Sequence, residues 1–231
     1  MNTQNTCPLC KSENNSLLYK DHLRDYLQCA NCDLVFVPSE CHLSLVEEKE
    51  RYDTHNNNPK DSRYRQFLSQ LTTPLNLLIP NRSFGLDFGC GPGPALSLML
   101  EEKGHRVELY DKFYYQDQSV FDKTFDFITL TEVIEHLSDP IFEIGRLKSI
   151  LKPDGVIAIM TQTLTQKTDF KAWYYKNDPS HIGFYNQKSL GYLADYFELE
   201  ITHYSERVIF LKKNLRKYIS VSYTHLTLPT N

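Results

Sequence analysis

The segment from Asp87 to Pro94 contains the residues whose chemistry is easiest to interpret. It reads Asp-Phe-Gly-Cys-Gly-Pro-Gly-Pro and follows an apolar segment. Gly89, Gly91 and Gly93 have no side chains, so they tolerate positive φ and let backbone amides approach a ligand closely. Pro94 suits the first turn of a helix, and the free amides there favour an anionic group. The pattern therefore predicts a strand, a ligand-binding turn and a helix.

Asp111 adds a second element to this predicted site. It follows the next apolar segment, 105–110, about twenty residues beyond the glycines, where an acidic residue accepts hydrogen bonds from ribose hydroxyls. Asp87, the glycines and Asp111 together predict a nucleoside-containing cofactor. A nicotinamide cofactor is disfavoured because the pattern G-x-G-x-x-G would need glycine where the chain has Pro94. The alternative is a turn that only packs a helix closely against a strand.

Two further groups are candidates for acid–base chemistry. Glu132 and His136 follow a strand predicted over 125–130, and they are four residues apart, so they share a face if that turn is helical. His136 is the leading candidate for a general base because imidazole titrates near neutral pH. His181 lies with Asp178 in an aromatic-rich loop after a later strand. The alternatives are a structural His136 beside a cofactor-holding Glu132, and a loop that only caps the core.

Two Cys-x-x-Cys pairs near the N-terminus are separated by eighteen residues, and they consist of Cys7, Cys10, Cys29 and Cys32. This spacing brings four thiolates into a tetrahedron around Zn²⁺. Because all four ligands come from the protein, the ion would be structural. Short strands typical of a zinc ribbon are expected at 17–19, 26–28 and 34–37. The alternative is a small β module that has lost its metal site.

The remaining pattern predicts an α/β protein with a Rossmann-like sheet. The sheet is expected to be mostly parallel, and a C-terminal antiparallel hairpin should close it at 198–203 and 207–212. Lys152–Gly155 is expected to form a turn. Only a short connection fits between Asp111 and Phe125, so one strand and helix should be abbreviated. We expect a zinc-ribbon-like module at 1–40, a helical linker at 41–80 and the main domain at 81–215.

Composition limits the classes of function. The chain has 231 residues, 41% of them hydrophobic, which is enough for one full domain and a small module. It has no apolar run of membrane-spanning length and no signal peptide at its start, so we expect a cytoplasmic protein without membrane contact. Its formal net charge of −4 gives no reason to expect nucleic acid as a partner. The oligomeric state is left open.

The combined motifs resemble class I S-adenosylmethionine-dependent methyltransferases, whose first motif is an acidic residue followed by G-x-G-x-G. The resemblance extends over about residues 52–212, and Thr131–His136 and Leu151–Gly155 are similar to the branch that contains ubiquinone-type O-methyltransferases. It implies that the methionine part of the cofactor is surrounded by Asp87, Gly89, Gly91 and Gly93. It also implies that Asp111 takes the ribose hydroxyls and that Thr131 and Glu132 line the methyl-transfer side.

The function expected from these features is methyl transfer from S-adenosylmethionine to a small-molecule metabolite. Catalysis would consist mainly of aligning the acceptor with the methyl carbon and excluding water. One alternative is an RNA methyltransferase that uses the zinc ribbon to hold RNA. The acidic net charge disfavours it, as does the lack of Asn/Asp-Pro-Pro-Tyr after the strand at 125–130. The other alternative is a regulatory protein that binds the cofactor without turnover.

The final residues, 221–231, do not match the rest of the chain in character. Val221–Thr230 matches the translation of a sequencing-library transposon adapter. We therefore interpret 221–231 as an adapter-derived artefact and exclude it from the fold prediction. Resequencing of the locus should give different codons after about residue 220, and an unchanged sequence would contradict this interpretation.

Overall fold

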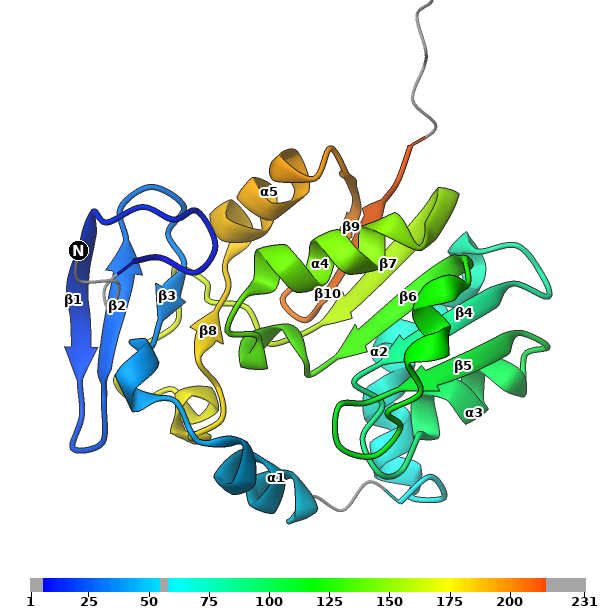
Figure 1. Cartoon of the computed structure of the whole chain (residues 1–231), viewed down its shortest axis with the longest axis horizontal. Helices are drawn as coiled ribbons and strands as arrows, with labels where there is room; N and C mark the ends of the chain where they lie inside the picture. The colour runs from blue at the N-terminus through cyan, green and yellow to red at the C-terminus, as the bar shows by residue number, and fades with distance from the viewer. Residues whose placement is uncertain (1–5, 55–57, 215–231) are drawn as a thin grey trace, which may run out of the picture.

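Two β-sheets organise the chain in the computed structural model, which describes residues 6–54 and 58–214 (Figure 1). The larger sheet has the strand order β5-β4-β6-β7-β10-β9, and the smaller one has the order β1-β2-β3-β8. Among the described helices, none combines the length and apolar character that a membrane span requires. The predicted artefact at 221–231 lies outside the described residues.

The large sheet confirms the Rossmann-like prediction. Its four neighbouring parallel strands are β5 (Arg106–Tyr110), β4 (Phe84–Phe88), β6 (Phe125–Thr131) and β7 (Leu151–Met160). The antiparallel hairpin that completes it consists of β9 (Glu200–Tyr204) and β10 (Val208–Lys212). Between β5 and β6 the chain forms a short 3-10 helix, Gln118–Asp122, and no strand. The predicted abbreviation after Asp111 is therefore confirmed.

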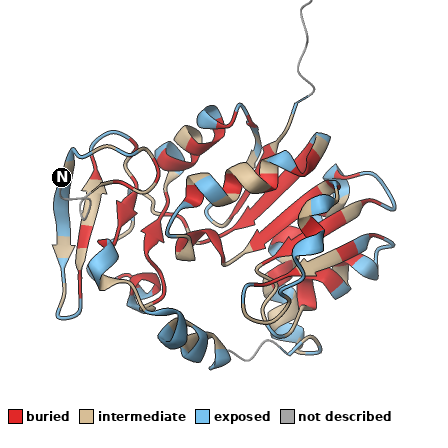
Figure 2. Cartoon of the chain, viewed as in Figure 1, coloured by how far each residue is buried: buried red, intermediate tan, exposed pale blue. Residues whose placement is uncertain are grey.

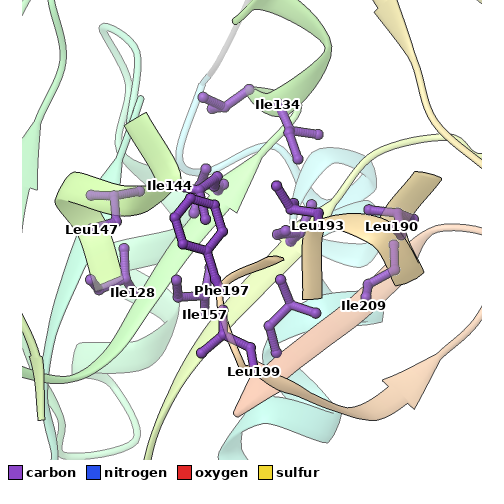
Figure 3. Close-up of a cluster of buried hydrophobic side chains, with 14 of the residues drawn as sticks. Ile128, Ile134, Ile144, Leu147, Ile157, Leu190, Leu193, Phe197, Leu199 and Ile209 are labelled. Atoms are coloured by element: carbon purple, nitrogen blue, oxygen red, sulfur yellow. The ribbon is translucent and has the colours of Figure 1, made fainter. Parts of the chain in front are cut away.

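Helices cover both faces of this sheet, and strand alternation divides the core between them. Val156, Ala158 and Met160 of β7 pack on the side of α2 (Ser62–Leu78) and α3 (Ala95–Glu101). Ile157 and Ile159 point the other way, because successive strand residues face opposite sides. There they meet α4 (Pro140–Ser149) and α5 (Gln187–Tyr196), whose buried residues Figure 3 shows gathered over the sheet.

The N-terminal strands form where the sequence predicts them. The antiparallel set consists of β1 (Asn15–Lys20), β2 (Asp25–Cys29) and β3 (Val35–Phe36). The strand β8 (Gly183–Phe184), which comes from the main domain and pairs with β3, was not predicted from the sequence. Helix α1 (Leu45–Asp53) has no buried residue and follows this sheet (Figure 2). The proposed division at residues 40 and 80 stays a prediction, since β8 joins the two parts.

The prediction of a separate turn at Lys152–Gly155 is wrong. These residues belong to β7, which begins at Leu151. Asp154 does have a left-handed φ of 61°. However, its amide donates to the Lys213 carbonyl at 2.7 Å, and the Gly155 carbonyl accepts from the Lys213 amide at 2.9 Å. Pairing with the chain beyond β10 therefore extends the strand through the turn sequence.

Arg24, in the connection between β1 and β2, joins the small sheet to the loop that carries His181. Its side chain is 6% exposed. The guanidinium donates to the backbone carbonyls of Lys176, Asp178 and Pro179 at 2.7, 2.7 and 2.8 Å. Its Nε donates to the Tyr26 hydroxyl at 3.0 Å. One buried cation thus donates hydrogen bonds to three backbone carbonyls of the same loop.

Replacement of Arg24 by alanine should lower the free energy of unfolding by about 2–4 kcal/mol, because it removes charged hydrogen bonds from a buried guanidinium to three loop carbonyls. The matched control is Arg63→Ala, at a position where the side chain is 92% exposed and a change below about 0.5 kcal/mol is expected. Urea denaturation of the two variants measures both values. Equal stabilities would contradict the role assigned to Arg24.

Candidate functional site

A cavity of about 820 Å³ opens at the carboxyl ends of β4, β5 and β6. Ligands of open α/β sheets bind at this edge, where the loops that follow parallel strands converge. Residues of the glycine turn, of α1 and α2, and of the 174–181 loop line the cavity. Its volume lies in the upper part of the range of about 300–1,000 Å³ that is usual for small-molecule sites. The cavity has room for more than one small ligand group.

The glycine turn has the backbone that the sequence predicts. Gly89 and Gly91 have φ values of +77° and +63°, a region that side chains disfavour. The Gly89 amide donates to the Tyr110 carbonyl at 2.7 Å, which fastens the turn to β5. A methyl group at Gly89 would lie 2.4 Å from Cγ2 of Val133. Both glycines line the cavity, whereas Gly93 is not among its lining residues.

Asp87 lies near the end of β4 and is 3% exposed. Its Oδ1 accepts a hydrogen bond from the Thr129 hydroxyl of β6 at 2.9 Å. Burial raises the pKa of Asp87 to about 7, and the nearby Asp111 charge adds to the shift while the Thr129 hydrogen bond opposes it. The buried carboxylate is therefore costly to keep charged, and a cationic ligand beside it would stabilise its ionised form.

Asp111 follows directly after β5, at the position predicted from the sequence. Its Oδ1 accepts from the amides of Phe113 and Tyr114 at 2.8 and 3.1 Å, and its Oδ2 accepts from the Gly91 amide at 3.0 Å. These bonds hold the carboxylate rigidly against the glycine turn. An ionised carboxylate has about four acceptor positions, so Asp111 retains capacity for a ligand hydroxyl.

Thr131 ends β6 and faces the same cavity as Asp87 and Asp111. Its hydroxyl oxygen is buried and has no hydrogen-bond partner among the described residues. A buried hydroxyl of this kind costs free energy unless a ligand or water completes it. The structure therefore brings Asp87, Gly89, Gly91, Asp111 and Thr131 to one cavity.

Glu132 and His136 also line the cavity, but not as neighbours on a helix face. The condition for a shared helix face is not met, because Glu132 has a left-handed φ of 53° and the 3-10 helix that follows spans only Ile134–His136. Oε2 of Glu132 accepts from the Tyr175 hydroxyl at 3.1 Å. Burial raises the pKa of Glu132 to about 7. A carboxyl that titrates near neutrality is suited to accept a proton.

Glu135 is a site residue that the sequence interpretation missed. It is fully buried, and its Oε1 accepts a short hydrogen bond from the Tyr175 hydroxyl. Burial raises the pKa of Glu135 to about 8, and the Glu132 charge contributes. The signal was available in the sequence, since Glu135 stands between apolar Ile134 and His136 after a buried strand, where an acidic side chain needs a partner.

His136 and His181 come together across the cavity wall, with ring centroids 4.7 Å apart. Nδ1 of His136 bonds to the Ser180 carbonyl at 2.9 Å, and Nδ1 of His181 bonds to the Tyr175 carbonyl at 2.7 Å. Burial lowers the pKa of His136 to about 3 and that of His181 to about 4. Both rings are therefore neutral near pH 7, and each carries its lone pair on Nε2.

Asp178, the predicted companion of His181, connects the loop to α1. Its Oδ2 accepts from Nε and Nη2 of Arg51 at 3.1 and 2.6 Å, and its Oδ1 accepts from the Ser180 hydroxyl at 2.6 Å. The Arg51 and Ser180 hydrogen bonds lower the pKa of Asp178 against the effect of burial. This paired carboxylate positions the loop and anchors α1 beside the cavity.

The predicted metal ligands form a second, separate cluster. Sγ of Cys7 lies 3.6 Å from Sγ of Cys32, and Sγ of Cys10 lies 3.4 Å from Sγ of Cys29. All four sulfur atoms lie within 4.8 Å of one another. A tetrahedral zinc ion with Zn–S bonds of about 2.3 Å requires sulfur atoms about 3.8 Å apart. The four thiols therefore fit a structural zinc ion.

The pH dependence of stability should reveal the buried Asp87. Its pKa is about 7 when folded and 3.8 as a free group. Because the folded value is raised, the stability that this group contributes is complete below about pH 4 and is lost as pH rises toward 7. Between about pH 5 and about pH 7, the wild type should lose about 2 kcal/mol relative to Asp87→Asn. Urea denaturation across this range, with exposed Asp169→Asn as control, measures the difference. Parallel curves for all three proteins would contradict it.

At Gly89, the cost of placing a side chain against Val133 can be measured separately from the cost of a side chain in a left-handed backbone conformation. Gly104 has a φ of +89° and nothing within 4 Å of an added methyl group, so Gly104→Ala should cost only the strain, about 1 kcal/mol. Gly89→Ala adds the contact with Val133 and should cost about 1–3 kcal/mol more. Denaturant unfolding of both variants tests this difference. Equal losses in the free energy of unfolding would show that the Val133 side chain moves aside at no cost.

Comparison with known proteins supports one family. A family model described as a methyltransferase domain matches residues 60–204. The ubiquinone biosynthesis O-methyltransferase of Histophilus somni (strain 2336) is 30% identical over 93 residues, which is 38% of this chain and 37% of that protein. The corresponding enzyme of Haemophilus ducreyi is 30% identical over 134 residues, 41% of this chain and 57% of that protein. The match thus spans about 37–57% of the length of these relatives.

A solved structure extends the likeness in fold. It is the Burkholderia thailandensis 1,6-didemethyltoxoflavin-N1-methyltransferase with bound 1,6-didemethyltoxoflavin and S-adenosylhomocysteine. It is 14% identical, with a TM-score of 0.51 over 87% of this chain and 100% of that chain. Because the family model covers more than half of the 231 residues, and the sheet order agrees with such a fold, the chain belongs to the methyltransferase domain family.

Proposed function

We propose that the protein transfers a methyl group from S-adenosylmethionine to a small-molecule acceptor. The observation that carries this proposal is one cavity lined both by the glycine turn with Asp111 and by the polar groups Glu132, His136 and His181. The family match supports the reaction type. The similar enzymes named above include O-methyltransferases, and the similar solved structure holds a small molecule with S-adenosylhomocysteine.

On the cofactor side, we assign roles from the chemistry of each group. Gly89 and Gly91 leave space for the methionine part, and the buried carboxylate of Asp87 suits its cationic amino group. Asp111 is held by three backbone amides and retains about one acceptor position for a ribose hydroxyl. Thr131 lines the same cavity, and its hydroxyl has no hydrogen-bond partner among the described residues, so we assign it to a ligand contact. We assign Gly93 only to the turn that leads the chain into α3.

On the acceptor side, we propose Glu132 as the proton acceptor. S-adenosylmethionine supplies a sulfonium methyl group, whose C–S bond breaks with its electron pair on sulfur as the acceptor atom bonds to carbon. An acceptor hydroxyl must lose its proton in that step. Glu132 is better matched to receive it than His136, because the pKa values are about 7 and about 3. We assign His136 and His181 to binding the acceptor through Nε2.

We further propose that the four cysteines bind zinc and that the N-terminal module is a zinc ribbon with a structural role. The two knuckles have matching turns, since Lys11 and Asp33 have φ values of 58° and 59°. Their amides donate to the carbonyls of Cys7 and Cys29 at 3.0 and 2.9 Å. Reduced thiolates of this kind are expected in the cytoplasm, where we propose the protein acts.

Calorimetry with S-adenosylmethionine tests the cofactor assignment. We expect one molecule to bind per folded, zinc-loaded chain and NAD⁺ not to bind. Asp111→Asn should weaken binding about tenfold or more, because charged hydrogen bonds to the ribose are lost. The control is Asp117→Asn, which changes a residue outside the cavity that caps the 3-10 helix at 118–122. A folded wild type that binds no S-adenosylmethionine rejects the proposal.

Methyl transfer is then measured with methyl-labelled S-adenosylmethionine, using a metabolite extract and total RNA as separate acceptors. Label in the small-molecule fraction supports the proposed function. Label in RNA favours the RNA methyltransferase that the sequence left as an alternative. Cofactor binding without any transfer favours the regulatory alternative.

A further inference from the structure

Arg207, in the turn between β9 and β10, lines the cavity beside Glu132. Its Nη2 donates to Oε1 of Gln162 at 3.3 Å and to the Tyr174 hydroxyl at 3.1 Å. The Tyr174 hydroxyl in turn donates to Oε1 of Gln162 at 2.7 Å. The guanidinium carbon also lies 5.5 Å from the ring centroid of Phe67 in α2. Contacts with α2 and with the segment after β7 therefore fix the position of the Arg207 guanidinium.

The charge of Arg207 is less fully neutralised than that of the other cations in the cavity wall. Four lysine or arginine side chains line the cavity in the part of the chain that the structure describes. Three of them meet a carboxylate at hydrogen-bond distance: Arg51 with Asp178 at 2.6 Å, Lys112 with Glu48 at 2.7 Å, and Arg146 with Glu143 at 2.6 Å. Arg207 differs, because its Nη1 lies 3.9 Å from Oε1 of Glu132. That distance is too long for a hydrogen bond.

Glu132 supplies an independent observation on the other side of this 3.9 Å separation. Its Oε1 is buried and has no hydrogen-bond partner among the described residues. A buried polar atom of this kind in a native protein needs an explanation. The guanidinium of Arg207 has five N–H groups, but its hydrogen bonds to described residues all start from Nη2. Glu132 therefore lacks a donor at the place where Arg207 lacks an anion.

We propose that Arg207 binds a carboxylate group of the methyl acceptor, so that the acceptor is a hydroxy acid. This inference rests on the proposed function and names its substrate class. The hydroxyl of such a molecule donates to Oε1 of Glu132 while its carboxylate accepts from Arg207, so one ligand supplies both missing partners. Because Arg207 and Glu132 lie 3.9 Å apart and each hydrogen bond adds about 2.8 Å, the two acceptor groups lie within about 9 Å of each other.

The reaction itself uses only the hydroxyl end of the hydroxy acid. Its proton passes to Glu132, and an oxygen lone pair forms the O–CH₃ bond as the S–CH₃ bond breaks with its electrons on sulfur. The carboxylate keeps its charge throughout and stays on Arg207. Binding at that second point orients the hydroxyl toward Glu132, which lowers the entropic cost of alignment.

The surroundings of Arg207 favour a carboxylate over a phosphate. The planar guanidinium matches the two oxygens of a carboxylate. A phosphate would bring a second negative charge beside Glu132, and like charges at that distance oppose each other.

The carboxylate of the cofactor is a second source of the same chemistry, and the contacts of Arg207 favour the acceptor instead. Its described side-chain partners are Gln162, Tyr174, Phe67 and Glu132, none of which belongs to the glycine turn. Arg207 also lines a neighbouring polar cavity of about 390 Å³, and no residue of the glycine turn is part of that wall. Arg207 thus lies on the acceptor side of the main cavity.

Binding of three probes with a common phenyl group tests the site: phenylacetate, phenylacetamide and phenyl phosphate. The phenyl group suits a wall that contains Tyr64, Phe67 and Tyr174. Each probe is titrated by NMR into the zinc-loaded full chain saturated with S-adenosylhomocysteine, whose own carboxylate then already occupies its site. The variants are Arg207→Gln and Arg207→Lys, and the control is Arg63→Gln, where the side chain is 92% exposed. Urea denaturation and S-adenosylhomocysteine binding of each variant show whether the fold is intact.

We expect the wild type to bind phenylacetate at least about tenfold more tightly than phenylacetamide, because only the carboxylate forms a charged hydrogen bond with Arg207. This preference should vanish in Arg207→Gln, persist in Arg207→Lys and stay unchanged in Arg63→Gln. Equal binding of the two probes by the wild type overturns the inference, and so does the absence of binding by both.

The remaining outcomes separate the possible sources of the anion. Tighter binding of phenyl phosphate than of phenylacetate overturns the assignment to a carboxylate. A loss of S-adenosylhomocysteine affinity of about tenfold in folded Arg207→Gln assigns Arg207 to the cofactor and also overturns the inference. A preference for phenylacetate that depends on Arg207, in a protein that transfers no methyl group, upholds the anion site and rejects the proposed function instead.

Discussion

The acceptor side of the cavity depends on a hydrogen-bonded connection between the two sheets. The Ile182 amide donates to the Glu135 carbonyl at 2.8 Å, and the Ile182 carbonyl accepts from the Val37 amide at 2.9 Å. Arg24 fixes the preceding carbonyls of the same loop from the small sheet. These bonds matter because the loop has little regular structure to satisfy its own backbone. The N-terminal module is therefore part of the framework that positions His181 and Tyr175.

Parallel strand pairing imposes the complementary constraint on the cofactor side. Register between β4, β5 and β6 brings Asp87, Asp111 and Thr131 to one edge, although they are far apart in sequence. The glycine turn can pass so close to this edge because Gly89 presents no side chain to Val133. A rigid edge of this kind orders the ligand groups before binding, which lowers the entropic cost of alignment. The loops then determine only the acceptor.

Buried polar groups are concentrated where the cofactor side and the acceptor side of the cavity meet. The Tyr175 hydroxyl lies within hydrogen-bond distance of both Glu132 and Glu135 and has one proton to share between them, and Arg207 lies 3.9 Å from Glu132. Low dielectric surroundings raise the pKa of both carboxyls and lower those of His136 and His181, since burial disfavours each charged form. This arrangement is costly for folding in the absence of ligands. It is consistent with a site whose electrostatics are completed by a cofactor and an acceptor.

Local and periodic features were determined by the sequence itself. The glycine turn, Asp111, the short connection before β6 and the cysteine spacing follow from residue type and interval, because each acts within a few residues of its neighbours. The tertiary structure decided what depends on distant partners. It put Glu132 in a left-handed conformation, gave β3 a partner in β8, and turned each imidazole toward a carbonyl so that Nε2 remained available. Glu135 became a site residue only when the 174–181 loop, held by Arg24, packed against it. No sequence pattern encodes that contact, because its energy comes from burial and hydrogen bonds between segments far apart in the chain.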